Sequence, residues 1–299
     1  MVRKKVFDFD KVFTFVNGLL LCLTAIVVMY PIYFIIVASI SDPTYVNAGQ
    51  TILLPKGLNF LGYQKIIEYD EVVTGFINTV KYTVLGTCIN LIVCIPTAFA
   101  LSRKELVGRK WLNLFFIFTM YFSGGLIPSY LVIDKLNMID TTWALVLPGA
   151  LNVYNMIVCR SFFQNNIPEE LFEASKIDGV DYTLFFFKIV LPLSKAIIAV
   201  MVLYHALVHW NQYLNVLYYI RDRDKYSLQL VLRNLMEMFK AESTDGFAGM
   251  DAASMVEMQK ANEAVRYAVI VVASIPVFLL YPLVQKYFVK GVMVGAVKG

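Results

Sequence analysis

The chain contains two histidines, His205 and His209, which lie four residues apart in an apolar stretch. At this spacing both imidazoles fall on one face of a helix, where they could hold a metal ion together. A zinc site needs three or four ligands, and the sequence offers no third histidine and no carboxylate to complete the set. It also shows no combination of nucleophile, base and acid. We therefore predict no metal site, and an integral-membrane enzyme is the weakest of the functional hypotheses.

A second group of small and polar residues stands between two long apolar stretches. It begins with Glu173-Ala174-Ser175, continues to Asp178-Gly179, and is followed by Ile189-Val190-Leu191-Pro192. Glycine can adopt the left-handed conformation that ends a helix, and proline can open the next one. The pattern predicts two short helices that meet at Gly179. Such a knob can fill a cleft in a partner, and a purely structural link between two spans is the alternative.

The ends of these two short helices are also marked. We expect Asn166 to cap the first helix, with Pro168 in its first turn and Glu169 three residues after the cap. Asp181 is the natural cap of the second helix, which leads to Pro192 and the next apolar stretch.

The composition places these residues in a membrane protein. The chain has 299 residues, of which 59% are hydrophobic and 16% are charged, and its mean hydropathy is +0.64. These values exclude a water-soluble domain. A helix needs about 20 apolar residues to cross the hydrocarbon core. Six stretches are long enough, namely 12–40, 76–101, 111–132, 143–163, 193–219 and 265–289. We predict an all-α integral membrane protein with six transmembrane helices, folded as a single domain over residues 1–299.

Charge sets the orientation of these spans. With the N-terminus inside, the short inner segments hold most of the Lys and Arg, as the positive-inside rule requires. The outer segments hold most of the Asp and Glu. Both termini are therefore expected in the cytoplasm. The formal net charge of +4 is explained by this topology, so it indicates no nucleic-acid partner.

The segment that contains Glu173 to Pro192, placed before the fifth span, resembles the EAA motif of ABC-importer permeases. Ser175 stands where a second alanine is common, which is a small and conservative difference. The segment Trp210-Asn211-Gln212-Tyr213 and a C-terminal stretch from Lys286 resemble the carbohydrate-importer branch related to the smaller maltose permease. The stretch Tyr121-Phe122-Ser123-Gly124-Gly125-Leu126-Ile127-Pro128 further resembles the subgroup that imports complex oligosaccharides, including fragments of uronate-rich polysaccharides.

This resemblance implies a type I ABC-importer permease, a multi-pass subunit of the bacterial cytoplasmic (inner) membrane. Residues 164–192 would form a cytoplasmic coupling loop, with Glu173, Ala174, Ser175, Asp178, Gly179 and Pro192 as the ATPase-coupling residues. The implied partners are a second homologous permease, two ATPase subunits, an extracytoplasmic sugar-binding protein, the oligosaccharide and membrane lipid. The sequence contains no phosphate-binding Gly-x-x-x-x-Gly-Lys-Ser/Thr loop. No cofactor is therefore expected in this chain, and ATP and Mg would be bound by the ATPase subunits.

A sugar needs hydroxyls, amides and aromatic faces along its path, and polar residues in hydrocarbon usually face the bundle interior or a water-filled cavity. The candidate path residues are Tyr121, Asn152, Asn155, Tyr204, His205, His209, Asn211 and Gln212. His205, His209 and Gln212 share one helical stripe, and Tyr204 and Asn211 share another. Helix packing is the competing interpretation. We favour packing for the stripe on the second span, which comprises Thr79, Thr83, Thr87, Asn90, Cys94 and Thr97.

Two other transporter classes remain as alternatives. An ion-coupled secondary transporter commonly needs ionisable residues near the midplane, and the interior spans carry no clear Asp or Glu. An ABC permease for another solute, such as an amino acid or a peptide, is opposed by the Trp210 segment and by the C-terminal stretch.

Two further segments carry expectations about partners. Residues 220–264 are expected to form an extracytoplasmic loop whose methionines offer adaptable apolar surface to the binding protein; Phe247 and Met250 lie in it. A solvated loop that packs on its own permease is the alternative. The C-terminal run from Gly291 is rich in glycine, so its backbone can follow a groove closely. We expect it to enter the seam between the two ATPase subunits, and a frayed basic end at the lipid headgroups is the alternative.

Overall fold

A computed structural model describes residues 9–245 and 252–296 of the chain. In these residues the regular structure is helical, apart from an isolated antiparallel bridge between Ser41 and Leu58. The chain divides into two compact units. Unit 1 comprises Met1–Tyr69 and Leu235–Ala273, and unit 2 comprises Asp70–Asn234 and Ser274–Gly299.

Unit 1 contains α1 (Phe9–Ser39), α2 (Pro43–Asn47) and α3 (Leu61–Ile67), together with the adjoining parts of α14 (Leu228–Asp245) and α15 (Ala252–Ala296). Most of α1 is apolar and exposed, as expected for a helix that faces lipid. Its last turns are held by polar and aromatic contacts. The Ser39 and Tyr63 hydroxyls are 2.8 Å apart, and the Phe34 and Tyr267 rings meet edge to face.

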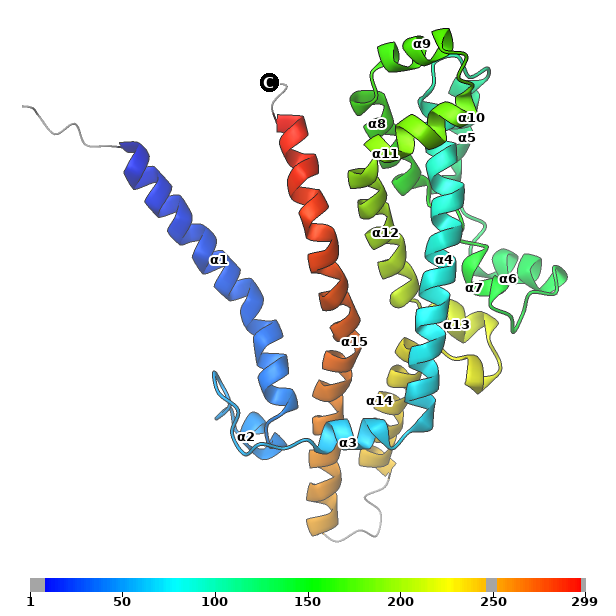
Figure 1. Ribbon diagram of the computed structural model, residues 1–299. Helices are drawn as coiled ribbons and strands as arrows, with labels where there is room; N and C mark the ends of the chain where they lie inside the picture. The colour runs from blue at the N-terminus through cyan, green and yellow to red at the C-terminus, as the bar shows by residue number, and fades with distance from the viewer. Residues whose placement is uncertain (1–8, 246–251, 297–299) are drawn as a thin grey trace, which may run out of the picture. The chain divides into compact units, whose positions relative to one another are not determined.

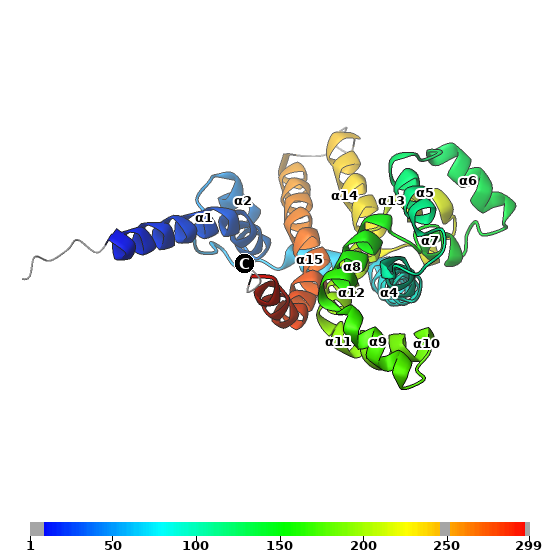
Figure 2. The same ribbon diagram turned by 90° about the horizontal axis from the view of Figure 1, so that it is seen from above.

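Unit 2 is organised around α4 (Asp70–Ser102), which packs against α12 (Lys195–Trp210) and α8 (Val153–Asn166) (Figures 1 and 2). Small residues on α4 allow these helices to approach closely. Thr79, Thr83, Thr87, Asn90 and Cys94 are buried on α4, and Thr97 is half-buried. The predicted packing role of this stripe is confirmed.

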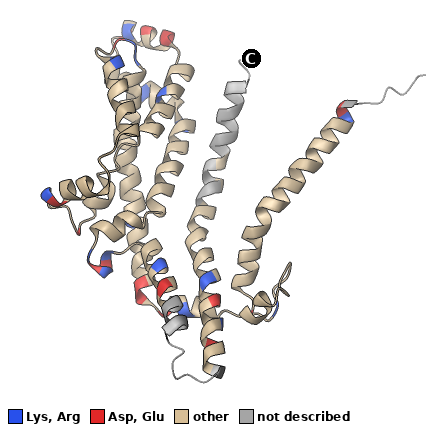
Figure 3. Cartoon of the chain, turned by 180° about the vertical axis from the view of Figure 1, so that it is seen from behind, with Lys and Arg blue, Asp and Glu red and all other residues tan. Residues whose placement is uncertain are grey.

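Apart from the parts of α14 and α15 that belong to unit 2, its remaining elements are short. They are α5 (Arg109–Tyr121), α6 (Leu126–Lys135), α7 (Trp143–Val146), α9 (Glu169–Ile177), α10 (Tyr182–Phe185), a π-helical turn (Phe186–Val190), α11 (Leu191–Leu193), α13 (Leu214–Tyr219) and a 3-10 turn (Arg223–Lys225). The charged residues of the unit lie mostly in the segments beyond the apolar middle parts of α4 and α12 (Figure 3). No charged residue lies between Lys81 and Arg103 on α4, or after Lys195 on α12.

Three described helices are long and apolar enough to cross a membrane alone, namely Asp10–Ser39, Asp70–Ser102 and Ser254–Leu279. Two bent pairs satisfy the same test when each is taken as one span. They are Arg109–Tyr121 with Leu126–Lys135, bent by 111°, and Tyr182–Leu193 with Lys195–Trp210, bent by 83°. The apolar helices that were predicted are present, but several of them are not continuous.

Three predicted spans are interrupted, which corrects their expected continuity. The third breaks at Ser123-Gly124-Gly125, where Gly125 has a φ of 83°. The fourth breaks between Val146 and Val153, around Pro148-Gly149, because proline lacks the N–H that a helix interior requires. The fifth breaks between Trp210 and Leu214.

Two segments outside the predicted spans are helical. In the predicted outer segment 220–264, α14 and the first turns of α15 occupy most of the residues. Phe247 and Met250 lie outside the described residues. The helix α15 continues to Ala296, so the run from Gly291 to that residue is helical, while Lys298 and Gly299 lie outside the described residues.

Candidate functional site

The segment with the Glu173 motif forms a short helix, α9, whose ends follow from local chemistry. Glu169 and Glu170 lie in its first turn, where a carboxylate interacts favourably with the helix dipole. At its C-terminal end the Asp178 N–H donates to the Ala174 carbonyl oxygen and the Gly179 N–H donates to that of Lys176. Gly179 has a φ of 73°. A residue with a Cβ is strained in that conformation. The predicted end at Gly179 is confirmed.

The predicted start of α9 is wrong by two residues. Asn166 ends α8 instead, and its Nδ2 donates to the Phe162 carbonyl oxygen at 3.0 Å. Pro168 occupies the N-cap position, and its side chain makes no capping hydrogen bond. The helix α8 extends beyond its apolar stretch as far as Asn166. Asn166 therefore cannot be the first residue of the predicted capping box.

The helix α9 has one anchored face and one exposed face. Phe172 and Ser175 are buried, and the Ser175 Oγ donates to the Phe172 carbonyl oxygen at 2.7 Å. The small Ser175 side chain therefore lies on the buried face of α9. The other predicted coupling residues on this segment are exposed, namely Glu173, Ala174, Asp178 and Gly179. Ile177 is 87% exposed, so an apolar side chain stands at the outer end of α9.

A cluster of phenylalanine rings connects α9 to the long helices of unit 2. We call Phe99, Phe163, Phe172, Phe185 and Phe186 the aromatic cluster; all five are buried. The centroid of the Phe172 ring is 5.1 Å from that of Phe185. Phe99 of α4 lies 5.0 Å from Phe186 and 6.1 Å from Phe163 of α8. Close-packed rings of this kind transmit displacement, because there is little free volume to absorb it.

A buried arginine completes the attachment of α9. The Arg103 guanidinium lies 5.1 Å from the Phe172 ring centroid and 5.8 Å from that of Phe99. Its Nη2 is 3.4 Å from the Glu169 Oε1, and the Lys104 Nζ is 3.7 Å from the Glu169 Oε2. No local pattern in the sequence marks Arg103 for this role. Its role here depends on contacts between distant parts of the chain.

The second short helix begins as predicted and ends differently. The Asp181 carboxylate accepts from the Leu184 N–H at 2.7 Å, which confirms this cap. The helix then continues through the π-helical turn and α11, which contains Pro192. The sharp bend follows at Ser194, before α12 begins. Pro192 is therefore exposed near the end of the second short helix and does not open α12.

The candidate path residues on α12 and directly after it separate into a buried and an exposed group. His205, His209 and Gln212 are buried against the rest of unit 2, whereas Tyr204 is 38% exposed and Asn211 is exposed. The His209 ring lies against α4 at Gly86, where an added Cβ would be 2.4 Å from the imidazole. Only glycine permits this approach.

His209 also takes part in a polar link across unit 2. Its Nε2 is 2.6 Å from the Asn90 Oδ1. The Asn90 Nδ2 donates to the carbonyl oxygens of Gly149 and Ala150 at 2.6 and 2.9 Å. Because Asn90 donates through Nδ2, its Oδ1 accepts from the His209 Nε2–H. This link gives His209 a packing role, and its place in a substrate path stays a prediction.

The other candidate path residues lie on separate elements. The Asn152 Oδ1 accepts from the Asn155 N–H at 3.0 Å and so caps α8. Asn155 is buried, and Asn152 is exposed. Tyr121 is 74% exposed at the end of α5. The exposed members, Tyr121, Asn152, Tyr204 and Asn211, are available to a molecule outside this chain.

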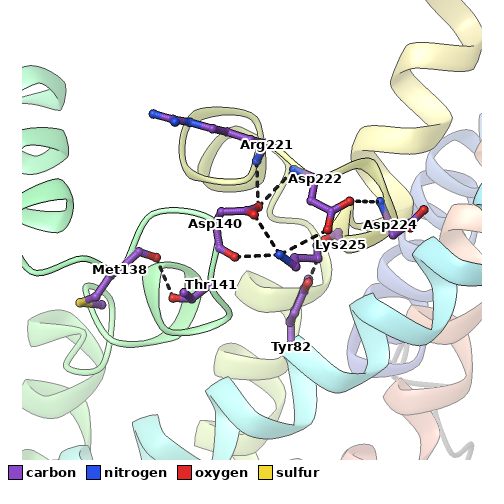
Figure 4. Close-up of polar contacts among 8 residues, drawn as sticks. All are labelled: Tyr82, Met138, Asp140, Thr141, Arg221, Asp222, Asp224 and Lys225. Carbon is purple, nitrogen blue, oxygen red and sulfur yellow. Dashed lines mark hydrogen bonds and ion pairs between the residues drawn. The ribbon is translucent and has the colours of Figure 1, made fainter.

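A polar network that the sequence analysis missed holds the loops at the other end of unit 2 (Figure 4). The Asp140 Oδ1 accepts from the N–H groups of Arg221 and Asp222, both at 3.1 Å. The Lys225 Nζ lies 2.9 Å from the Asp140 Oδ2 and 3.3 Å from the Asp222 Oδ2. The Tyr82 hydroxyl donates to the Lys225 carbonyl oxygen at 2.8 Å. We call these five residues the Asp140 network.

The network changes the acidity of its central carboxylate. The Lys225 side chain, followed by the N–H groups of Asp222 and Arg221, lowers the pKa of Asp140 below its ordinary value of 3.8, against the opposing effect of burial. The same contact raises the pKa of Lys225. Both groups are therefore charged near neutral pH, and the carboxylate fixes the 221–225 turn.

Known proteins resemble this chain over almost its whole length. Residues 72–294 match the protein family described as "Binding-protein-dependent transport system inner membrane component". The chain is 38% identical over 283 residues to the "Polygalacturonan/rhamnogalacturonan transport system permease protein YtcP" of Bacillus subtilis, covering 93% of this chain and 96% of that protein. It is 29% identical over 289 residues to the "Galactooligosaccharides transport system permease protein GanQ" of the same organism, covering 94% of each.

A solved structure has a similar fold. It is described as the "Crystal structure of a bacterial ABC transporter involved in the import of the acidic polysaccharide alginate". The TM-score is 0.78 at 31% sequence identity, with 94% of this chain and 98% of that chain covered.

Proposed function

Because this chain belongs to the family of inner membrane components of binding-protein-dependent transport systems, we propose that it carries oligosaccharides through the membrane as the transmembrane subunit of an ATP-driven importer. The chain itself is a transport component and not an enzyme. In this proposal a second, related permease forms the other half of the path. Two ATPase subunits bind ATP and Mg, and an extracytoplasmic binding protein delivers the sugar.

The observation that carries the proposal is the two-sided construction of α9. Its outer face presents Glu173 and the 87% exposed Ile177, and its inner face is fixed by Phe172 in the aromatic cluster. An ATPase subunit that grips the outer face would therefore move Phe99 and Phe163 with it. These residues belong to α4 and α8, which form much of unit 2.

We assign this end of unit 2 to the cytoplasm. Support comes from the Lys and Arg residues of the segments at 103–110 and 160–195, because the positive-inside rule counts these residues and not the net charge. In this orientation both termini are cytoplasmic and the Asp140 network lies on the outer side. The binding protein would then approach the loops held by Asp140 and Lys225.

We propose oligosaccharides as the substrate class because the relatives are named for oligosaccharide or polysaccharide transport. The names of two of them refer to acidic polymers, polygalacturonan/rhamnogalacturonan and alginate. Oligogalacturonates and neutral galactooligosaccharides are therefore the first pair to compare. In this proposal the exposed residues Tyr204 and Asn211 contact the sugar, and the buried His209 positions α12 against α4.

The test is uptake by the complete complex reconstituted in liposomes with ATP inside and labelled oligosaccharide outside. We expect Glu173→Lys to reduce uptake by at least about tenfold, since a loss of about 1.4 kcal/mol in productive docking has that effect. Its abundance in the membrane should not change, because Glu173 is exposed. Glu71→Lys, a charge reversal at an exposed residue of α4, is the matched control. Normal ATPase association and uptake by Glu173→Lys would reject the coupling role of α9. No ATP-driven uptake of either sugar class would reject the substrate class.

A further inference from the structure

A cavity with a basic wall lies at the first turn of α5 in unit 2. Its volume is about 860 Å³. Lys104, Arg109, Lys110 and Arg160 contribute the charged part of its lining, and no Asp or Glu lines it. Trp111, Leu114 and Ile117 contribute an apolar part along the next turns of α5. We call this space the cationic cavity.

The positive charge of this cavity is largely uncompensated within the described residues. The Arg109 Nε donates to the neutral carbonyl oxygen of Leu101 at 3.0 Å. The Arg160 Nη1 donates to the neutral amide of Asn113, and the Arg160 Nε is buried without a hydrogen-bond partner. Among the described carboxylates, Glu169 alone pairs with a cation of the wall, Lys104. An anion placed between these cations would gain charge-assisted hydrogen bonds and relieve their mutual repulsion.

The apolar part of the wall distinguishes an amphiphile from a small anion. No residue of α5 is buried, and Trp111 is 76% and Leu114 57% exposed. This helix belongs to a bent pair that is apolar enough to cross a membrane. Inorganic phosphate could use only the basic part, whereas a phospholipid could use both. Basic pockets beside transmembrane helices are known to bind anionic headgroups.

We propose that the cationic cavity binds an anionic phospholipid such as phosphatidylglycerol. Arg109, Lys110 and Arg160 contact the headgroup phosphate, and the acyl chains follow Trp111, Leu114 and Ile117. The first turn of α5 also favours an anion, since its N-cap is Gly108, which supplies no side-chain acceptor. The inference requires only that α5 lies in a membrane, so it is independent of the transported sugar.

Photolabelling of the complete complex tests this site. The complex is placed in phosphatidylcholine nanodiscs that contain a small fraction of phosphatidylglycerol with a diazirine in its acyl chain, and adducts are mapped to the tryptic peptide that contains Trp111 in each variant. We expect labelling in the wild type and about fivefold weaker labelling for Lys110→Gln or Arg160→Gln, because each basic residue near anionic lipid contributes about 1 kcal/mol. Lys195→Gln, which removes an exposed lysine outside the cavity, should label normally.

Competition identifies the source of the phosphate. Unlabelled phosphatidylglycerol should suppress the adducts, and added phosphatidylcholine should not. Suppression by millimolar inorganic phosphate would assign the cavity to a free phosphate and overturn the lipid proposal. Equal labelling of Lys110→Gln and Lys195→Gln would also overturn it, and Lys110 is exposed, so loss of folding would not confuse this comparison. A complex that fails to transport any sugar but shows this labelling pattern would leave the lipid site standing.

Discussion

At the α9 end of unit 2 the rings of Phe99, Phe172 and Phe185 are buried against one another, whereas at the other end the Asp140 network joins half-exposed charged side chains. The aromatic cluster gains its stability from apolar burial and from dispersion, which depend weakly on salt and pH. Exposed ion pairs contribute little and are screened by salt. The end proposed to transmit force is therefore held by packing, and the end proposed to receive the binding protein is held by polar contacts.

The largest expected effect comes from removing the ring that fixes α9. Phe172→Ala should destabilise unit 2 by about 3–5 kcal/mol, because it removes a buried aromatic side chain and leaves a cavity. Thermal unfolding of the purified complex measures this change, and uptake should also be lost. Leu171→Ala, at the neighbouring 39% exposed position, is the control and should have a much smaller effect. Full uptake by Phe172→Ala would show that α9 is not coupled through the aromatic cluster.

The next effect tests the helix contact that joins the two ends. Gly86→Ala should destabilise the protein by about 1–3 kcal/mol, since the new Cβ would overlap the His209 ring and force α4 and α12 apart. Gly149→Ala introduces the same methyl group where no atom lies within 4 Å, so it serves as the control. Equal melting temperatures for the two variants would contradict the close approach of His209 to α4.

A smaller effect is expected from the Asp140 network. Asp140→Asn keeps an oxygen that can accept from the N–H groups of Arg221 and Asp222 but removes the charge that pairs with Lys225. The melting temperature should fall by less than in Gly86→Ala, and the difference from the wild type should shrink as salt is added. Glu71→Gln, which neutralises an exposed acid outside the network, controls for net charge. A salt-independent loss as large as that of Phe172→Ala would remove the contrast between the two ends.

The smallest expected effect is a pH dependence of stability that distinguishes the Asp140 network from the aromatic cluster. The pKa of Asp140 is lower in the folded protein than its ordinary value of 3.8, so its stabilising contribution is present above that value. The contribution is lost as the pH falls through the folded-state pKa. The difference in melting temperature between the wild type and Asp140→Asn should therefore vanish in acid, whereas that of Phe172→Ala should persist. If the difference in melting temperature between the wild type and Asp140→Asn grew in acid, this prediction would be wrong.

Local signals in the sequence were sufficient for several features of the candidate site. Gly179 ends α9 because glycine adopts a positive φ without strain, and Asp181 caps α10 because its carboxylate reaches a free N–H nearby. Membership of the ABC permease family, predicted from the Glu173 and Trp210 segments, is confirmed. Glycine and proline mark the breaks near Gly125 and Pro148 in the sequence, although the length and hydropathy of these stretches predict continuous spans.

The sequence by itself determined the membrane class, the apolar helices, the position of the short helix α9 and the small residues that line α4, because each depends on composition or on neighbouring residues. Only the tertiary structure decided which side chains meet across the fold. Asn90 and His209 are 119 residues apart, Asp140 and Lys225 are 85 apart, and Arg103 and Glu169 are 66 apart. No local pattern encodes such pairs, because they form only when α4, α8 and α12 bury their shared apolar faces and bring these polar groups within reach.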